Sequence, residues 1–95
     1  MIEFEWDDAK AEANYRKHGV RFSEGMTVWS DGNALEIPDP DHSEHEERWI
    51  RMGLSQAIRI LVVVYAERLA NGRVRLISAR KATKTETASY HWRQR

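Results

Sequence analysis

Hydrophobic and polar positions alternate with a period of two along much of the second half of the chain. Arg48–Leu54 alternates, which predicts a strand with one buried side. Ile58–Glu67 is apolar nearly throughout, as is typical of a central strand covered on both faces, and Ser55-Gln56 suits the turn before it. Arg73–Ala79 alternates again and follows Asn71-Gly72, the strongest hairpin signal in the sequence. These stretches predict consecutive strands of an antiparallel sheet.

Helices are predicted on both sides of these strands. Asp8–Lys17 is rich in alanine and long side chains, and Gly19 follows at the position of a left-handed C-cap. Ser23 is a candidate N-cap for a short second helix, and Thr83–Trp92 begins with the spacing of a capping box. Two further short strands are predicted at Ile2–Trp6 and Ala34–Ile37. The sum is an α+β fold: an antiparallel meander of three or four strands, two N-terminal helices and a C-terminal helix.

The composition is typical of a globular protein. The 95 residues make one small domain, residues 1–95, with 41% apolar and 32% charged residues. The absence of cysteine excludes disulfides, thiolate zinc sites and cysteine nucleophiles, and it favours a reducing compartment. The longest apolar run, Ile60–Ala66, is too short to cross a bilayer, and the acidic N-terminus lacks the apolar core of a secretory signal. We therefore expect a cytoplasmic protein without a membrane partner.

Charge is distributed unevenly, although the net charge is zero. From Arg73 to Arg95, seven lysines and arginines stand against Glu86 alone, whereas residues 1–12 and 36–47 are acidic. Such a chain can present one positive face without a basic isoelectric point. The basic segment predicts a surface that binds phosphate groups, such as those of RNA.

Arg80 is the first candidate for phosphate binding. If the alternation continues, the face of Val74 and Leu76 leads to Ser78 and then Arg80, so this arginine lies where the core face opens. The planar guanidinium fork suits a phosphate bidentately. A surface ion pair with the acidic loop explains Arg80 equally well.

Proton-transfer candidates lie near Arg80 and Lys81. Glu86 and Tyr90 are four residues apart and share a helix face, so they could join the two cations in an acid/base group. The capping box alone explains Glu86, however, and a core position explains Tyr90. His18 suits proton transfer near neutral pH, although its place at a helix end also suits a partner for the helix dipole.

Further RNA-binding candidates are Arg51, Trp49 and the basic residue Lys84. Arg51 and Trp49 could stack on a base; alternatively, Trp49 packs beneath a helix and Arg51 is solvated. His42 and His45 lie among carboxylates and could bind a transition metal, although a solvated acidic loop is the favoured interpretation. No P-loop, dinucleotide fingerprint or HExxH motif is present, so we predict no cofactor and no metal.

Four stretches resemble, in order and spacing, the BrnT family of toxins from bacterial type II toxin–antitoxin systems. They are Phe4-Glu5-Trp6-Asp7 with Ala9-Lys10 and Asn14; Lys17-His18-Gly19-Val20 with Phe22; Asp39-Pro40-Asp41-His42-Ser43 with Glu46-Glu47-Arg48; and Ile77-Ser78-Ala79-Arg80-Lys81-Ala82-Thr83 with Glu86 and Tyr90. The chain departs from the family pattern at Ser30-Asp31-Gly32 and at His45.

The resemblance implies a RelE-like fold and a ribonuclease that arrests translation. It also implies neutralisation by a BrnA-like ribbon-helix-helix antitoxin, through which alone the complex would contact operator DNA. Carried onto matching positions, the catalytic candidates are His18, Arg80, Lys81, Glu86 and Tyr90. We therefore predict a metal-independent endoribonuclease in which the ribose 2′-hydroxyl is the nucleophile, with RNA, free or on the ribosome, as substrate. The alternative is a non-catalytic module that binds RNA or a protein.

Overall fold

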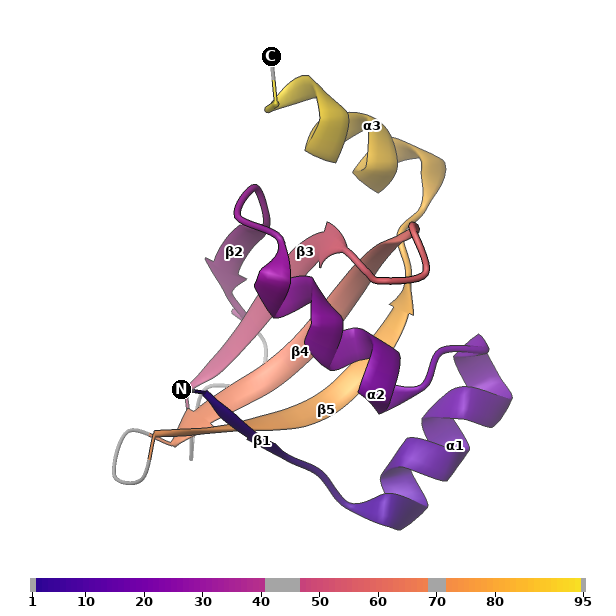
Figure 1. Ribbon diagram of the computed structural model, residues 1–95, viewed down its shortest axis with the longest axis vertical. Helices are drawn as coiled ribbons and strands as arrows, with labels where there is room; N and C mark the ends of the chain where they lie inside the picture. Colours follow the sequence, from indigo (N-terminus) through magenta and orange to yellow (C-terminus); the bar gives the residue numbers. More distant parts are fainter. Residues whose placement is uncertain (1, 41–46, 69–71, 95) are drawn as a thin grey trace.

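A five-stranded sheet with the strand order β1-β5-β4-β3-β2 forms the centre of the molecule (Figure 1). The computed structural model describes residues 2–40, 47–68 and 72–94. Its elements are β1 (Glu3–Glu5), α1 (Asp8–His18), α2 (Phe22–Gly25), the 3₁₀ helix η1 (Met26–Ser30), β2 (Leu35–Pro38), β3 (Arg48–Leu54), β4 (Ile60–Arg68), β5 (Arg73–Lys81) and α3 (Lys84–Trp92). The α+β class predicted from the sequence is confirmed.

Strands β2 to β5 form a continuous antiparallel meander, as the alternating pattern predicts. β1 then adds a fifth strand by pairing in parallel with β5, a long-range contact that no local pattern in the sequence indicates. The ends of α1 follow the predicted chemistry: the Asp7 side chain caps the helix, and Gly19 closes it with a φ of 69°. The prediction of Ser23 as the next N-cap is wrong, because α2 already begins at Phe22 and has Arg21 as its N-cap, without a side-chain hydrogen bond. This second helix is one α-turn that continues as the 3₁₀ helix η1.

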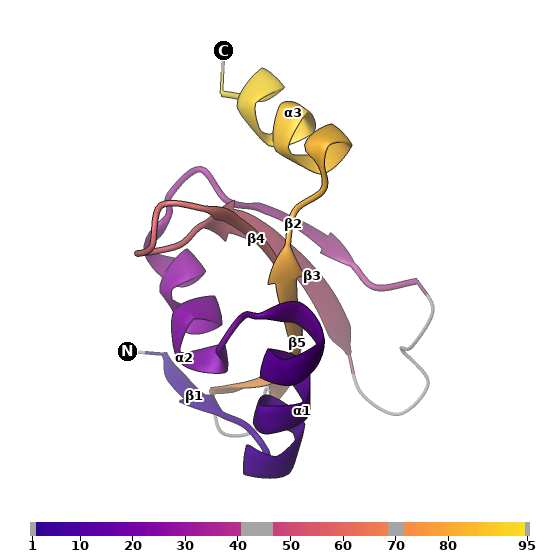
Figure 2. The same cartoon turned by 90° about the vertical axis from the view of Figure 1, so that its right-hand side faces the viewer.

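The helices α1, α2 and η1 lie on one face of the sheet (Figure 2). The hydrophobic core fills the space between these helices and the sheet. Gly25 lets α2 approach closely, because a Cβ there would lie 3.3 Å from the Cβ of Ala79. The buried side chain of Asn14 holds α1 against β5 by donating to the Ala79 carbonyl at 2.8 Å and accepting from its N–H at 3.1 Å. The core residues are Val20, Phe22, Val28, Leu61, Val63, Tyr65, Val74, Leu76 and Ala79.

A β-bulge in β5 changes the face on which Arg80 lies. The register against β4 skips Ile77, and beyond it Ala79 continues the buried side of Leu76. The prediction that Arg80 extends the face of Val74 and Leu76 is therefore wrong. Arg80 pairs with Val62 on the opposite face, which the N-terminal helices leave uncovered and which we call the open face.

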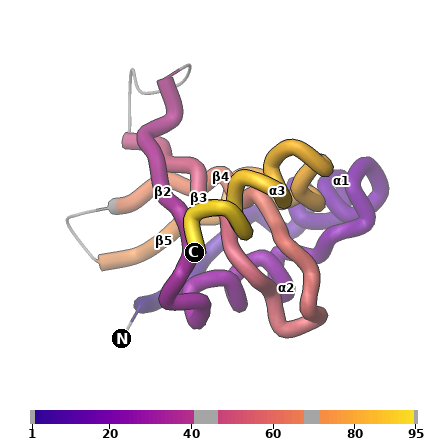
Figure 3. The backbone as a smooth tube through the Cα atoms, turned by 90° about the horizontal axis from the view of Figure 1, so that it is seen from above, coloured from indigo at the N-terminus to yellow at the C-terminus, as the bar shows by residue number. Residues whose placement is uncertain are grey.

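The C-terminal helix α3 lies across the end of the sheet rather than against either face (Figure 3). The predicted capping box is present: Thr83 Oγ1 accepts from the Glu86 N–H at 3.1 Å, and Glu86 Oε1 accepts from the Thr83 N–H at 2.8 Å. The helix start is therefore fixed immediately after Arg80 and Lys81, which places its side chains beside the predicted phosphate-binding residues.

Candidate active site

Arg80 and Glu86 form a two-pronged ion pair at the junction of β5 and α3. The guanidinium Nη1 and Nη2 donate to the two carboxylate oxygens at 2.7 and 2.8 Å. The hydrogen bonds from Arg80 hold the pKa of Glu86 down to about 2, although partial burial opposes this shift. Glu86 is therefore ionised and a weak base at neutral pH, because an efficient general base has a pKa near the operating pH.

Lys81 ends β5 with an exposed side chain that makes no ion pair with any described residue. It faces a depression of about 430 Å³ between the β3–β4 turn and α3, which we call the Lys81 depression. The same depression is lined by Leu54, Ile58, Thr87 and His91. Neighbouring side chains of a strand point to opposite faces, so Lys81 and Arg80 lie on opposite sides of the end of β5.

Tyr90 is buried on α3, and its hydroxyl donates to the Asp31 carboxylate at 2.5 Å. Burial, followed by the bond to Asp31, raises the pKa of Tyr90 to about 12. Asp31 also accepts from the Leu54 N–H at 2.8 Å. Gly53 gives this carboxylate room, because a Cβ at Gly53 would lie 3.3 Å from Asp31 Oδ2. The geometry thus makes Tyr90 an anchor for α3.

Two histidines lie at this end of the molecule. His18 is the last residue of α1 and is partly exposed; the next carbonyl, of Gly19, accepts from Arg59 Nη2 at 3.2 Å beside the Lys81 depression. His91 is exposed and lines that depression directly. The sequence reasoning did not select His91 or Asp31. Thr87 and His91 are four residues apart and share a helix face, and this spacing is a local signal that could have pointed to His91. Asp31 acts through contacts with residues far away in the sequence, which no local pattern reveals.

The RNA-binding candidates Arg51 and Trp49 lie on the helix-covered face, away from Arg80. Arg51 pairs with Glu36 at 2.9 Å, and its guanidinium carbon lies 5.2 Å from the ring centroid of Trp29 rather than over Trp49. Trp49 packs against the core. Lys84 is exposed at the start of α3. Of the three, the structure brings only Lys84 near Arg80 and Lys81.

His42 and His45, the disfavoured metal-ligand candidates of the sequence, lie outside the described residues. Within the described ranges, no three histidine, aspartate or glutamate side chains come close enough together to hold a metal ion. The same part of the chain has no helix long and apolar enough to cross a membrane.

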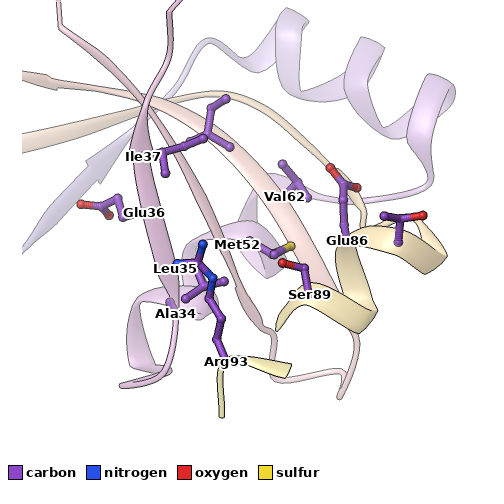
Figure 4. A pocket seen from close by; sticks show the side chains of 11 residues that line it. Ala34, Leu35, Glu36, Ile37, Met52, Val62, Glu86, Ser89 and Arg93 are labelled. Atoms are coloured by element: carbon purple, nitrogen blue, oxygen red, sulfur yellow. The ribbon is translucent and has the colours of Figure 1, made fainter. Parts of the chain in front are cut away.

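The open face carries an apolar groove of about 560 Å³. One end of this groove reaches Glu86, at the junction of β5 and α3 where Glu86 pairs with Arg80; we call this junction the Arg80–Glu86 corner. Figure 4 shows Leu35, Met52 and Val62 along the groove, with Ser89 and Arg93 of α3 facing them. The groove is largely apolar in its middle and charged where α3 crosses it. Its side chains come from β2, β3, β4 and α3, so it depends on the whole meander.

Comparison with known families decides the class of this protein. Residues 6–86 match the family model described as the BrnT ribonuclease toxin of type II toxin–antitoxin systems. The chain belongs to the BrnT family. This membership implies an RNA target and an antitoxin partner.

The fold agrees with that of a solved family member. The crystal structure of the ribonuclease toxin BrnT from Brucella abortus, at 1.1 Å resolution, superposes with a TM-score of 0.64 and 21% sequence identity. The match covers 88% of this chain and 100% of the Brucella chain. A comparison with curated proteins gives no match. Arg80 and Lys81 lie within the residues that match the family model of ribonuclease toxins.

Proposed function

We propose that this BrnT-family protein is an endoribonuclease toxin that cleaves RNA without a metal ion. The observation that carries the proposal is the position of Arg80 and Lys81, two adjacent cations at the exposed end of β5, in a chain of a ribonuclease toxin family. Both can hold RNA phosphates and neutralise the charge that builds up on phosphorus in the transition state. Arg80 already makes a two-pronged contact with a carboxylate, which is the geometry it would offer to a phosphate.

The reaction needs a nucleophile, a base and an acid. The ribose 2′-oxygen attacks the adjacent phosphorus as a base takes its proton, and the bond from phosphorus to the 5′-oxygen breaks as an acid protonates that oxygen. The products carry a 2′,3′-cyclic phosphate and a 5′-hydroxyl. We assign proton transfer to His18, whose neutral imidazole takes the 2′-hydroxyl proton and whose protonated form then returns it to the leaving 5′-oxygen. The ion pair makes Glu86 a weak base, and the high pKa of Tyr90 makes it a weak acid.

Cleavage of RNA in the presence of EDTA tests this proposal. We expect wild-type protein to cut single-stranded RNA at catalytic concentrations, and Arg80→Ala to lower kcat/KM by about 10² to 10³ fold, as for removal of one charge-stabilising donor. Arg16→Ala is the matched control, since Arg16 is an exposed arginine of α1 that pairs with Glu12 of the same helix. Intact RNA with wild type, at concentrations that stop growth, would favour the non-catalytic binding module instead.

The proposed partner is a BrnA-like ribbon-helix-helix antitoxin that covers the open face. Ile37 of β2 is 55% exposed on this face, next to the half-buried Ile50 and Met52. A small domain that leaves apolar side chains uncovered is suited to a protein partner. The groove ends at the Arg80–Glu86 corner, so an antitoxin in it would also obstruct the proposed catalytic residues.

A further inference from the structure

The turn between β3 and β4 presents an apolar side chain in a conformation that is unfavourable for it. Ile58 has a φ of 60° and is the only residue other than glycine with a positive φ among the described residues. It is 83% exposed, so packing against the described residues offsets little of the strain. Glycine or asparagine fits such a turn position, whereas a β-branched residue there is an outlier. Residues held in this way are concentrated at ligand-binding sites.

Ile58 forms one wall of the Lys81 depression. Leu54, which is 40% exposed, lies in the same depression, and Thr87 and His91 of α3 line it as well. A volume of about 430 Å³ falls within the usual range of small-molecule sites. The depression thus combines apolar side chains on the turn with hydrogen-bonding side chains on α3.

The charge of the depression favours an anionic ligand. Lys81 has no ion-pair partner in the described parts of the chain, and His91 lies near it. The other cation, Arg59, is neutralised by Glu24, with which it makes a two-pronged ion pair. No aspartate or glutamate among the described residues lines the depression. A ligand with both a flat apolar surface and a phosphate matches these groups.

From this geometry we infer that the Lys81 depression holds one nucleotide of the RNA, next to the scissile phosphate. Its base lies against Ile58 and Leu54, and its phosphate binds Lys81. Arg80 and Lys81 are consecutive residues on opposite sides of the end of β5, and Arg80 Nη1 donates to the Lys81 carbonyl at 3.3 Å, so an RNA strand on Arg80 reaches the depression by crossing the end of this strand. The inference rests on the proposed ribonuclease function and adds a site that determines which nucleotide flanks the cut.

Ile58→Gly separates this binding role from a structural one. Glycine accepts the positive φ without strain, so the thermal midpoint should not fall, because relief of strain offsets the added freedom of the unfolded chain. The base contact is lost, so the Kd for a single-stranded RNA with a 2′-deoxy substitution at the cleavage position should rise about tenfold. Leu54→Ala, which shortens the second apolar side chain of the depression, should also weaken binding. Ile2→Gly is the control, because Ile2 is also exposed but lies before β1.

Binding and cleavage are measured on the full chain with the same RNA, and the positions of the cuts are mapped in a mixed-sequence RNA. We expect Ile58→Gly to weaken binding and to flatten the base preference next to the cut. Unchanged Kd and preference, with wild type still cleaving, would overturn the subsite and leave the ribonuclease proposal intact. Weakened antitoxin binding with normal RNA binding would assign Ile58 to a protein interface and also overturn it. Wild-type protein that binds RNA without cutting it would overturn the ribonuclease proposal. The Kd values of wild type and Ile58→Gly for RNA would still decide whether the depression is a nucleotide site.

Discussion

At the residue scale, the contact between Arg80 and Glu86 determines what each residue can do. Glu86 already accepts hydrogen bonds from Arg80 and from the Thr83 N–H, which accounts for its position and its lowered pKa. The carboxylate is thus better suited to orienting Arg80 than to taking a proton from the 2′-hydroxyl. A phosphate that binds Arg80 must compete with this carboxylate, so Glu86 also limits the affinity for RNA.

Glu86→Gln tests that role. Glutamine can keep the capping bond to the Thr83 N–H but carries no charge, so Arg80 becomes more available to phosphate. We expect RNA cleavage within a few-fold of wild type, or faster. Glu3→Gln is the control, since it weakens an exposed ion pair with Arg73 at the start of β5, the opposite end of the strand from Arg80. A loss of cleavage of about 10² fold or more in Glu86→Gln alone would instead identify Glu86 as the general base.

The same ion pair predicts a pH dependence of stability. Glu86 has a folded-state pKa of about 2 against an ordinary value of 4.5. A carboxylate whose pKa is lowered by folding stabilises the protein above its unfolded-state pKa, and this contribution is lost as the pH falls through the folded-state pKa. Urea unfolding should therefore show a stability contribution that is complete above pH 4.5 and lost between pH 4.5 and about 2. In Glu86→Gln the slope over this range should be shallower; an unchanged slope would contradict the assignment.

At the element scale, side-chain hydrogen bonds attach α3 to the rest of the molecule. Beyond the Arg80–Glu86 pair, the Tyr90 hydroxyl binds Asp31, and the Gln94 side chain donates to the Asn33 carbonyl at 3.2 Å. Both acceptors lie in the turn between η1 and β2, so this turn positions the helix that carries Glu86, which orients Arg80.

Tyr90→Phe should loosen this attachment. The buried phenol loses a hydrogen bond to a charged acceptor, which lowers the free energy of unfolding by about 1.5–3 kcal/mol. Hydrogen exchange should increase in α3 before it increases in β3 to β5. Tyr15→Phe serves as the control, because Tyr15 is exposed. If Tyr90 were instead the catalytic acid, Tyr90→Phe would abolish cleavage with no change in the exchange of α3.

The elements differ in how far the sequence predicts them. Alternation and capping residues locate β3, β5, α1 and α3 to within about two residues, because those signals are local. The bulge at Ile77 is not visible in the alternation, and one skipped residue moves Arg80 to the other face. The parallel pairing of β1 with β5 and the Asp31–Tyr90 bond join residues far apart in the chain, so no local pattern could indicate them.

At the scale of the whole molecule, the two faces of the sheet have different surroundings. One face carries α1, α2 and the core, and the other leaves its apolar groove uncovered. β5 ends with Arg80 and Lys81 just before α3, which lies across this end of the sheet (Figure 3). A protein partner on the open face and an RNA at this end would therefore compete for the same corner.

Ile37→Asp tests the partner side of this arrangement. A carboxylate in the apolar groove should weaken antitoxin binding, measured by copurification and titration, while cleavage of free RNA stays near wild type. Ile2→Asp is the matched control, since Ile2 is exposed outside the groove. Antitoxin binding that is unchanged in Ile37→Asp would show that the antitoxin binds elsewhere on the chain.

The central claim is cleavage by the RNA's own 2′-hydroxyl at the Arg80–Lys81 corner. Its most direct test is analysis of the RNA ends produced by wild-type protein in EDTA, with Lys81→Ala in parallel. We predict 2′,3′-cyclic phosphate and 5′-hydroxyl ends, no cleavage of RNA with a 2′-deoxy substitution at the cut site, and a strong loss of rate in Lys81→Ala. Products with 3′-hydroxyl and 5′-phosphate ends, or cleavage that requires a divalent ion, would contradict it.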